Sequence, residues 1–200
     1  MLHVVRHGRT EANAAGLLLG RLDPDLDEVG ERQAEQVAAA IGPVDRVVSS
    51  PLLRTRRTAE AFSRSHGSEG SDGLSIELDE RWIEMDYGTF DGQPVAGVPR
   101  ETWAAWRADL DWAPPEGESH RSLGLRVRAA LDDLFEASRT EEIVVVTHVS
   151  PIKAALAWTL GVGDEVAWRT FVAPASIMTI GAGPAGPSLR GFNDVAHLRN

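Results

Sequence analysis

The stretch EIVVVTHVSPIKAALAWTL, residues 142–160, decides the fold class, because an unbroken apolar run is followed by a short polar turn and an apolar helix. A strand in which apolar and polar residues do not alternate is typical of a strand that is buried on both faces. The turn places His148 directly after the apolar run. We therefore predict a buried β-strand whose carboxyl end presents a histidine.

The same pattern occurs twice more, closer to the amino terminus. The run LHVV (2–5) leads into Arg6 and His7, and the run VDRVV (44–48) leads into Ser50. Three strands of this kind are most simply joined through helical crossovers, as parallel strands require. The sequence thus predicts a mainly parallel sheet whose strands end in polar or reactive side chains.

Helices and further strands fill the intervals between these runs. Helical spacing of apolar residues occurs in the segments 28–41 and 122–137, and a short helix is expected around 99–110. Ser50 followed by Pro51 is typical of a helix N-cap and first helical residue. The remaining segments are a loop at 66–73, a strand that becomes irregular at 74–85 and two strands at 175–194. We predict one α/β domain over residues 1–200, a three-layer α/β/α sandwich.

Composition excludes several classes of protein. The chain has 30 acidic and 20 basic residues, a net charge of −10, which argues against a nucleic-acid partner. It has no cysteine, which excludes disulfides, a thiolate nucleophile and thiolate zinc sites. No apolar run reaches the ~18 residues of a membrane span. No secretory signal is apparent, so we expect a cytoplasmic protein without membrane partners.

The strand ends predict where the site lies. Ligands of open α/β sheets bind beyond the carboxyl ends of the strands, so His7 and His148 are expected at the same rim. Arg6 adjoins the first histidine, and Arg54 falls in the first turn of the helix after the second apolar run. Arginine and a helix N-terminus both favour phosphate oxygens, and a neutral imidazole can act as nucleophile or base. The combination indicates a basic pocket for a phosphate monoester.

Simpler interpretations of each motif exist. The turn after residues 2–5 could be an ordinary hydrogen-bonded turn, and the run RTRR (54–57) could be a solvated helix face. Glu84 alone could be an exposed loop residue. Two histidines could also bind a metal ion, but the sequence lacks H-x-x-x-H or a comparable ligand spacing. The joint occurrence of two histidine-bearing strand ends and an arginine-bearing helix start favours the phosphate site, and we expect no metal.

Taken in order, seven segments resemble the histidine phosphatase superfamily, which has the phosphoglycerate mutase-like fold. RHGRTEAN is similar to the R-H-G-x-T-x-x-N signature, and the resemblance extends along nearly the whole chain. The segments are RHGRTEAN (6–13), LLGRLDPDLDEVGERQA (18–34), SSPLLRTRRTA (49–59), ERWIEMDYGTFDG (80–92), PEGES (115–119), VVVTHVSPIKAAL (144–156) and FNDVAHL (192–198).

This resemblance implies a mechanism without cofactor or metal. His7 would be the nucleophile and form a phosphohistidine. Glu84 would protonate the leaving alkoxide and then activate water, and His148 would be a further catalytic residue. The side chains that would bind the phosphoryl group are Arg6, Asn13, Arg54 and His148. The expected substrate is a small phosphate monoester, and a homodimer is common in the family.

Two departures from the family pattern concern the substrate. Pro24 falls one place early relative to the usual D-x-P-L. Val149 and Ser150 follow the second histidine where the family usually has glycine, which could narrow the pocket. The segment 86–118 is a candidate substrate-capping segment. It contains no lysine and Arg100 is the only arginine in its first half, which favours simple hydrolysis over phosphoglycerate mutase-type transfer. A catalytically idle domain that binds phosphorylated partners is the other alternative.

The tryptophans of the capping segment have two interpretations. Trp103, Trp106 and Trp112 could cap the pocket and favour a bulky leaving group, or they could pack a helix onto the sheet. The sequence alone does not separate the two, and it does not name the phosphorylated substrate.

Overall fold

A computed structural model describes residues 1–65 and 74–198, so the predicted loop at 66–73 lies outside the described residues. None of the helices within these two ranges has the length and apolarity to cross a membrane. The strands are β1 (Leu2–Arg6), β2 (Arg46–Ser49), β3 (Ile76–Leu78), β4 (Ile143–Thr147), β5 (Ile177–Gly183) and β6 (Gly186–Asp194). The α-helices are α1 (Glu11–Ala14), α2 (Glu28–Ile41), α3 (Leu53–Ser65), α4 (Arg100–Ala108), α5 (His120–Phe135) and α6 (Val149–Leu160). The short 3₁₀ helices are η1 (Glu80–Trp82), η2 (Gly88–Phe90), η3 (Val95–Gly97), η4 (Ala137–Arg139) and η5 (Asp164–Arg169).

The strands form one mixed sheet in the order β3-β2-β4-β1-β5-β6. The first four strands of that order are parallel, and β5 and β6 add an antiparallel hairpin at the edge beside β1. In the register, Arg6 lies opposite Thr147 and Ser49 lies opposite Val146. The ends of β1, β2 and β4 therefore coincide, and the predicted mainly parallel α/β sheet is confirmed.

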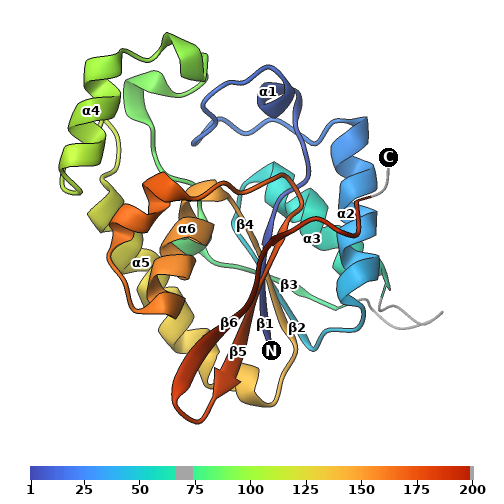
Figure 1. Ribbon diagram of the computed structural model, residues 1–200. Helices are drawn as coiled ribbons and strands as arrows, with labels where there is room; N and C mark the ends of the chain where they lie inside the picture. Colours follow the sequence, from blue (N-terminus) through green and yellow to red (C-terminus); the bar gives the residue numbers. More distant parts are fainter. Residues whose placement is uncertain (66–73, 199–200) are drawn as a thin grey trace.

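Helices cover both faces of the sheet (Figure 1). Successive residues of a strand point to opposite faces, so Val4 packs in the core on the α5 and α6 side, whereas Val5 packs in the core on the α2 and α3 side. Val145 and Val146 of β4 divide in the same way, and all four valines are fully buried. Burial on both faces explains why these strands are apolar throughout.

The predicted helix start at Ser50 and Pro51 is wrong. Helix α3 begins at Leu53, whose backbone N–H donates to Oδ1 of Asp23 at 2.6 Å. Ser50 is instead turned toward the rim, where its hydroxyl lies 2.8 Å from Nε2 of His148. The carboxylate of Asp23, from a distant loop, therefore accepts the N–H of the first helical residue, while Oγ of Ser50 accepts the N–H of Leu52 before the helix at 3.4 Å.

The segment 86–118 lies at the end of the sheet where the parallel strands finish, with α4 as its only α-helix (Figure 1). Trp106 of α4 is 1% exposed and stacks on Trp103 with ring centroids 5.5 Å apart. Trp112 and Tyr87 contact the same indole at 5.5 and 5.8 Å. These residues join the core that includes α5 and α6, so the tryptophans do pack the segment onto the domain.

Candidate active site

The two histidines meet at the ends of β1 and β4. Their ring centroids are 5.2 Å apart, and both side chains are almost completely buried. The backbone N–H of His7 donates to the carbonyl oxygen of Thr147 at 3.0 Å, which extends the β1–β4 pairing into the turn. Ser50, the residue that follows β2, contacts Nε2 of His148 through its hydroxyl at 2.8 Å. The rim thus brings together the polar residues that follow three strands.

The protonation state of His7 follows from its surroundings. Burial, Arg54 and Arg6 together hold the pKa of this imidazole well below its ordinary value, so the ring is neutral near neutral pH. Nδ1 lies 2.7 Å from the carbonyl oxygen of Gly8, which can only accept a hydrogen bond. Nδ1 therefore carries the single ring proton, and Nε2 has a free electron pair for attack on an electrophile.

The turn that carries His7 is fixed by close backbone contacts. The N–H of Gly8 donates to Oγ1 of Thr58 on α3 at 3.0 Å. A Cβ atom at Gly8 would collide with the backbone of Gly30, and one at Gly30 would collide with the backbone of Arg9. Glycine at both positions lets the first turn of α2 lie directly against the nucleophile's turn.

Two buried guanidinium groups flank the histidines. Arg6 donates from Nη1 to the carbonyl of Val172 at 2.7 Å, and burial lowers its pKa to about 10. Arg54 is fully buried and donates to the carbonyls of Leu22 and Gly20 at 2.7 and 2.8 Å. Burial lowers the pKa of Arg54 as well. Arginine remains protonated near neutral pH despite such shifts, so both groups are cations held mainly by neutral carbonyl oxygens.

The loop that holds Arg54 is itself positioned by Asp91. Its carboxylate accepts the backbone N–H groups of Gly20, Arg21 and Leu22 at 2.8, 2.8 and 2.9 Å. The carbonyl groups of two of these residues are the ones that receive the Arg54 guanidinium. Sequence reasoning placed Asp91 in a motif without assigning it any role, because its partners are about seventy positions away.

Glu84 lies at the amino terminus of α6. Its Oε1 accepts the N–H groups of Met85 and Ser150 at 2.7 and 3.2 Å, and its Oε2 accepts the N–H of Val149 at 3.1 Å. Val149 and Ser150, which stand where the family usually has glycine, therefore donate their backbone N–H groups to the Glu84 carboxylate. Arg126 donates from Nη2 to the carbonyl of Glu84 at 3.3 Å and so helps to hold the backbone of this residue.

A cavity of about 180 Å³ opens between these groups. Among the predicted site residues, Arg6, His7, Asn13 and Glu84 line it, whereas Arg54 and His148 do not. Val149, which stands where the family usually has glycine, lines it too. Oδ1 of Asn13 accepts the N–H of Thr10 at 3.2 Å, so the amide NH₂ is the end that can donate to a ligand.

Buried nitrogen atoms identify the chemistry that this pocket suits. Within residues 1–65 and 74–198, Nε of Arg6, Nε of Arg54 and Nδ1 of His148 are buried without a hydrogen-bond partner. Buried polar groups are rarely left unpaired in folded proteins, and two of these are guanidinium donors. Unpaired guanidinium donors at this rim favour an anion with several acceptor oxygens, such as a phosphoryl group.

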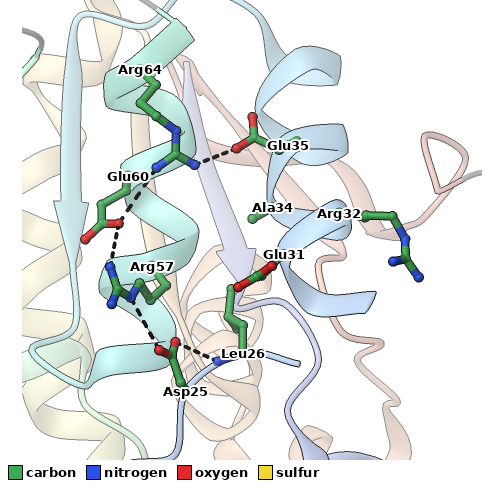
Figure 2. Close-up of a pocket in the computed structure, with 9 residues that line it drawn as sticks. All are labelled: Asp25, Leu26, Glu31, Arg32, Ala34, Glu35, Arg57, Glu60 and Arg64. Carbon is green, nitrogen blue, oxygen red and sulfur yellow. Dashed lines mark hydrogen bonds and ion pairs between the residues drawn. The ribbon is translucent and has the colours of Figure 1, made fainter. Parts of the chain in front are cut away.

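A larger cavity, of about 500 Å³, lies between α2 and α3, away from the strand ends (Figure 2). Two of its three arginines are already paired: Arg64 with Glu35 and Glu60, and Arg57 with Glu60 and Asp25. The third, Arg32, points away from the other lining residues (Figure 2). No predicted site residue lines it, and it has no buried orphan donor in the described part of the chain. In that same part of the chain, no group of three or more His, Cys, Asp or Glu side chains could hold a metal ion.

The comparisons with known sequences agree with the motifs. A family model of the histidine phosphatase superfamily (branch 1) matches residues 2–195. A bifunctional protein of Mycobacterium tuberculosis is 33% identical over 182 residues, which are 88% of this chain and 48% of that relative. The chain thus spans about half the length of this and two other mycobacterial relatives. A relative from Yersinia enterocolitica, named "Probable phosphoglycerate mutase GpmB", is 32% identical over 88% of this chain and 82% of its own length.

Solved structures have the same fold. A mutant phosphoserine phosphatase from Entamoeba histolytica, in complex with phosphoserine, superposes with a TM-score of 0.87 at 27% identity. That match covers 99% of this chain and 98% of the other. A mycobacterial glucosyl-3-phosphoglycerate phosphatase in complex with VO₃ gives a TM-score of 0.84 at 26% identity, over 96% and 98% of the two chains.

Proposed function

The chain belongs to the histidine phosphatase superfamily, branch 1, and on that premise we propose that it hydrolyses a small phosphate monoester through a phosphohistidine, without metal or cofactor. The observation that carries this proposal is the state of His7. Its neutral ring has a free electron pair on Nε2, and it lies beside two buried guanidinium groups with unpaired N–H donors. A nucleophile and the cations for its target are thus assembled at one place.

In the first step, Arg6, Arg54, Asn13 and His148 bind the phosphoryl oxygens. Nε2 of His7 attacks phosphorus, and a nitrogen–phosphorus bond forms while the bond from phosphorus to the ester oxygen breaks. The electron pair of that bond passes to the ester oxygen. Phosphoryl transfer depends on positioning and on stabilisation of charge, and the guanidinium groups of Arg6 and Arg54 stabilise the charge.

Glu84 provides the proton movements, because it lines the same cavity as the nucleophile. In its protonated form it donates to the departing alkoxide, and the resulting carboxylate then takes a proton from water. That water attacks phosphorus, the nitrogen–phosphorus bond breaks, and its electron pair returns to Nε2 of His7. A general acid placed in this way contributes about 10²- to 10⁴-fold in rate.

Hydrolysis is favoured over mutase chemistry by the charges of the pocket. A mutase must hold a second phosphate, for which the phosphoryl cavity offers Arg6 as its only cationic lining residue within residues 1–65 and 74–198 and the adjoining cavity offers Lys153 alone. Arg100, the remaining cation at the start of the capping segment, is exposed at the first position of α4. Incubation with 3-phosphoglycerate separates the two: release of free phosphate supports hydrolysis, and formation of 2-phosphoglycerate would reverse the proposal.

The direct test is hydrolysis of p-nitrophenyl phosphate by the wild type, His7→Ala and a control, His197→Asn. The control histidine lies outside the phosphoryl cavity and makes one contact to the carbonyl of Ala175. We expect the control to be active and His7→Ala to be inactive. If the wild type and His7→Ala are equally inactive across many esters, the proposed phosphatase function is wrong.

Several features stay predictions from the sequence. They are the organisation of residues 1–200 as one domain, with 86–118 as its capping segment, the cytoplasmic location, and the homodimer. Size-exclusion chromatography with light scattering tests the last of these.

A further inference from the structure

A second cavity, of about 130 Å³, adjoins the phosphoryl cavity. Leu18, Tyr87 and Val149 line both, so the two share a wall. We call it the indole cavity, after the tryptophans among its other lining residues. The lining residues that matter here are Tyr87, Trp103, Trp106, His120, Lys153 and Trp168. A substrate held by its phosphoryl group would extend its leaving group in this direction.

The walls of the indole cavity are largely aromatic. Trp103 and Trp106 are stacked, and Trp168 meets both edge-on at 6.2 and 6.1 Å between centroids. The indole N–H groups of Trp106 and Trp168 are buried without a partner in the described chain. An apolar cavity of about 150 Å³ is known to hold a benzene-sized group. The space therefore suits a ring-sized group that carries hydrogen-bond acceptors.

Lys153, the only lysine of the sequence, supplies the charge of this cavity. Its Nζ donates to the carbonyl of Ala167 at 2.8 Å, and it forms no ion pair with the described carboxylates. Burial lowers its pKa, and burial together with this cation lowers the pKa of His120 to about 4, so the histidine is neutral. A partly buried cation without a counterion is costly unless an anion completes the site.

The neighbouring acids do not serve as that counterion. Asp164 is paired with Arg128 through contacts of 2.6 and 3.1 Å. Glu118 is paired with Arg126 through contacts of 2.7 and 2.8 Å. Glu84, whose charge acts on the lysine, is held by backbone N–H groups at the start of α6. The positive charge in the indole cavity is thus available to a ligand.

We propose that the indole cavity binds the leaving group, and that this group is a ring-sized alcohol or phenol bearing a carboxylate that pairs with Lys153. The proposal rests on the proposed phosphatase function and narrows its substrate class. The phosphoryl group occupies the first cavity, the ring lies against the indoles, and the carboxylate reaches the ammonium group. The two buried indole N–H groups can donate to the remaining acceptor oxygens.

The test compares kcat/KM for phenyl phosphate with kcat/KM for 3-carboxyphenyl and 4-carboxyphenyl phosphate, which place the carboxylate at two positions of the ring. We expect the wild type to prefer at least one carboxylated ester. Lys153→Met should reduce that preference by about 10- to 100-fold, the effect of losing one charge-assisted hydrogen bond. Arg107→Met is the matched control, because its guanidinium lies over Trp168 at 5.5 Å but does not line the cavity. This control should keep the wild-type preference.

A ratio of two substrates measured on the same preparation is insensitive to a loss of folded enzyme. The proposal is overturned if the wild type shows no preference for either carboxylated ester, or if Lys153→Met retains the preference. It is also overturned if Arg107→Met reduces the preference for the carboxylated esters as much as Lys153→Met does. Failure of the underlying function looks different, because no aryl phosphate would then be hydrolysed in a manner that depends on His7.

Discussion

Replacement of Arg54 by methionine tests the assignment of the phosphoryl site most directly. The guanidinium is fully buried, its two Nη atoms are held by carbonyl groups, and its Nε is unpaired in the described chain. Methionine keeps the apolar length of the side chain and removes the cation. Loss of one donor to a developing oxyanion costs about 10²- to 10³-fold in kcat, which is about 3 to 4 kcal/mol.

Stability should fall as well, for a reason that can be separated from catalysis. The hydrogen bond from Arg54 to the carbonyl of Gly20 is buried, so Arg54→Met leaves a buried acceptor without a donor. That loss costs about 1 to 3 kcal/mol. The bond to Leu22 is only partly buried, and water can replace its donor there. Denaturant unfolding measures this loss independently of any substrate.

The matched control is Arg57→Met, on the same helix. Its side chain is 49% exposed and pairs with Asp25 and Glu60 at the surface, so neither kcat nor stability should change measurably. Rates are measured with p-nitrophenyl phosphate at saturating concentration, under conditions where both variants are fully folded. An Arg54→Met variant with wild-type kcat would refute the placement of this guanidinium on the phosphoryl group, as would an equal loss in the control.

Four further outcomes are expected. Glu84→Gln should lower kcat by about 10²- to 10⁴-fold for alkyl phosphates and by much less for p-nitrophenyl phosphate, whose leaving group needs no proton; equal losses for both esters would contradict its role as the acid. The pKa of His120 is about 4 in the folded chain and 6.5 in the reference state, so its contribution to stability is complete above pH 6.5 and is lost as the pH falls toward 4. In denaturant titrations the unfolding free energy lost in this way approaches about 3 kcal/mol, and His120→Phe should flatten the dependence of that free energy on pH. Gly30→Ala should destabilise by about 1 to 3 kcal/mol, seen as a lower unfolding midpoint, because its Cβ meets only backbone atoms. A chelator such as EDTA should leave phosphatase activity unchanged, and inhibition reversed by a metal ion would revive the metal alternative.

The rim was accessible to sequence reasoning because it depends on local patterns. Continuous apolar runs marked β1, β2 and β4 as buried parallel strands, and the residue after each run had to reach the same edge of the sheet. Ser50 shows the limit of that reasoning. It follows β2 as predicted, but it contacts His148, because Asp23 from a distant loop occupies the start of α3. A capping rule applied to neighbouring residues cannot detect such a competitor.

Other parts of the site depend on contacts between distant segments. The N–H groups of Val149 and Ser150 hold Glu84 across 65 and 66 positions, and no periodicity of the chain reports such a contact. The indole cavity likewise combines α4 with Trp168 of η5 and Lys153 of α6. The sequence suggested a capping role for the tryptophans but not the lysine beside them, because one lysine on an apolar helix carries no spacing signal.

The way Arg54 is anchored has a consequence for the approach of a substrate. Asp91 holds in place the carbonyl groups that receive this guanidinium, and Asp23 is 3.9 Å from Nη1, beyond hydrogen-bond distance. An incoming dianion therefore has no tightly bound internal competitor to displace before it reaches the guanidinium. The guanidinium can thus take up and release a phosphoryl oxygen without first breaking a hydrogen bond to a carboxylate.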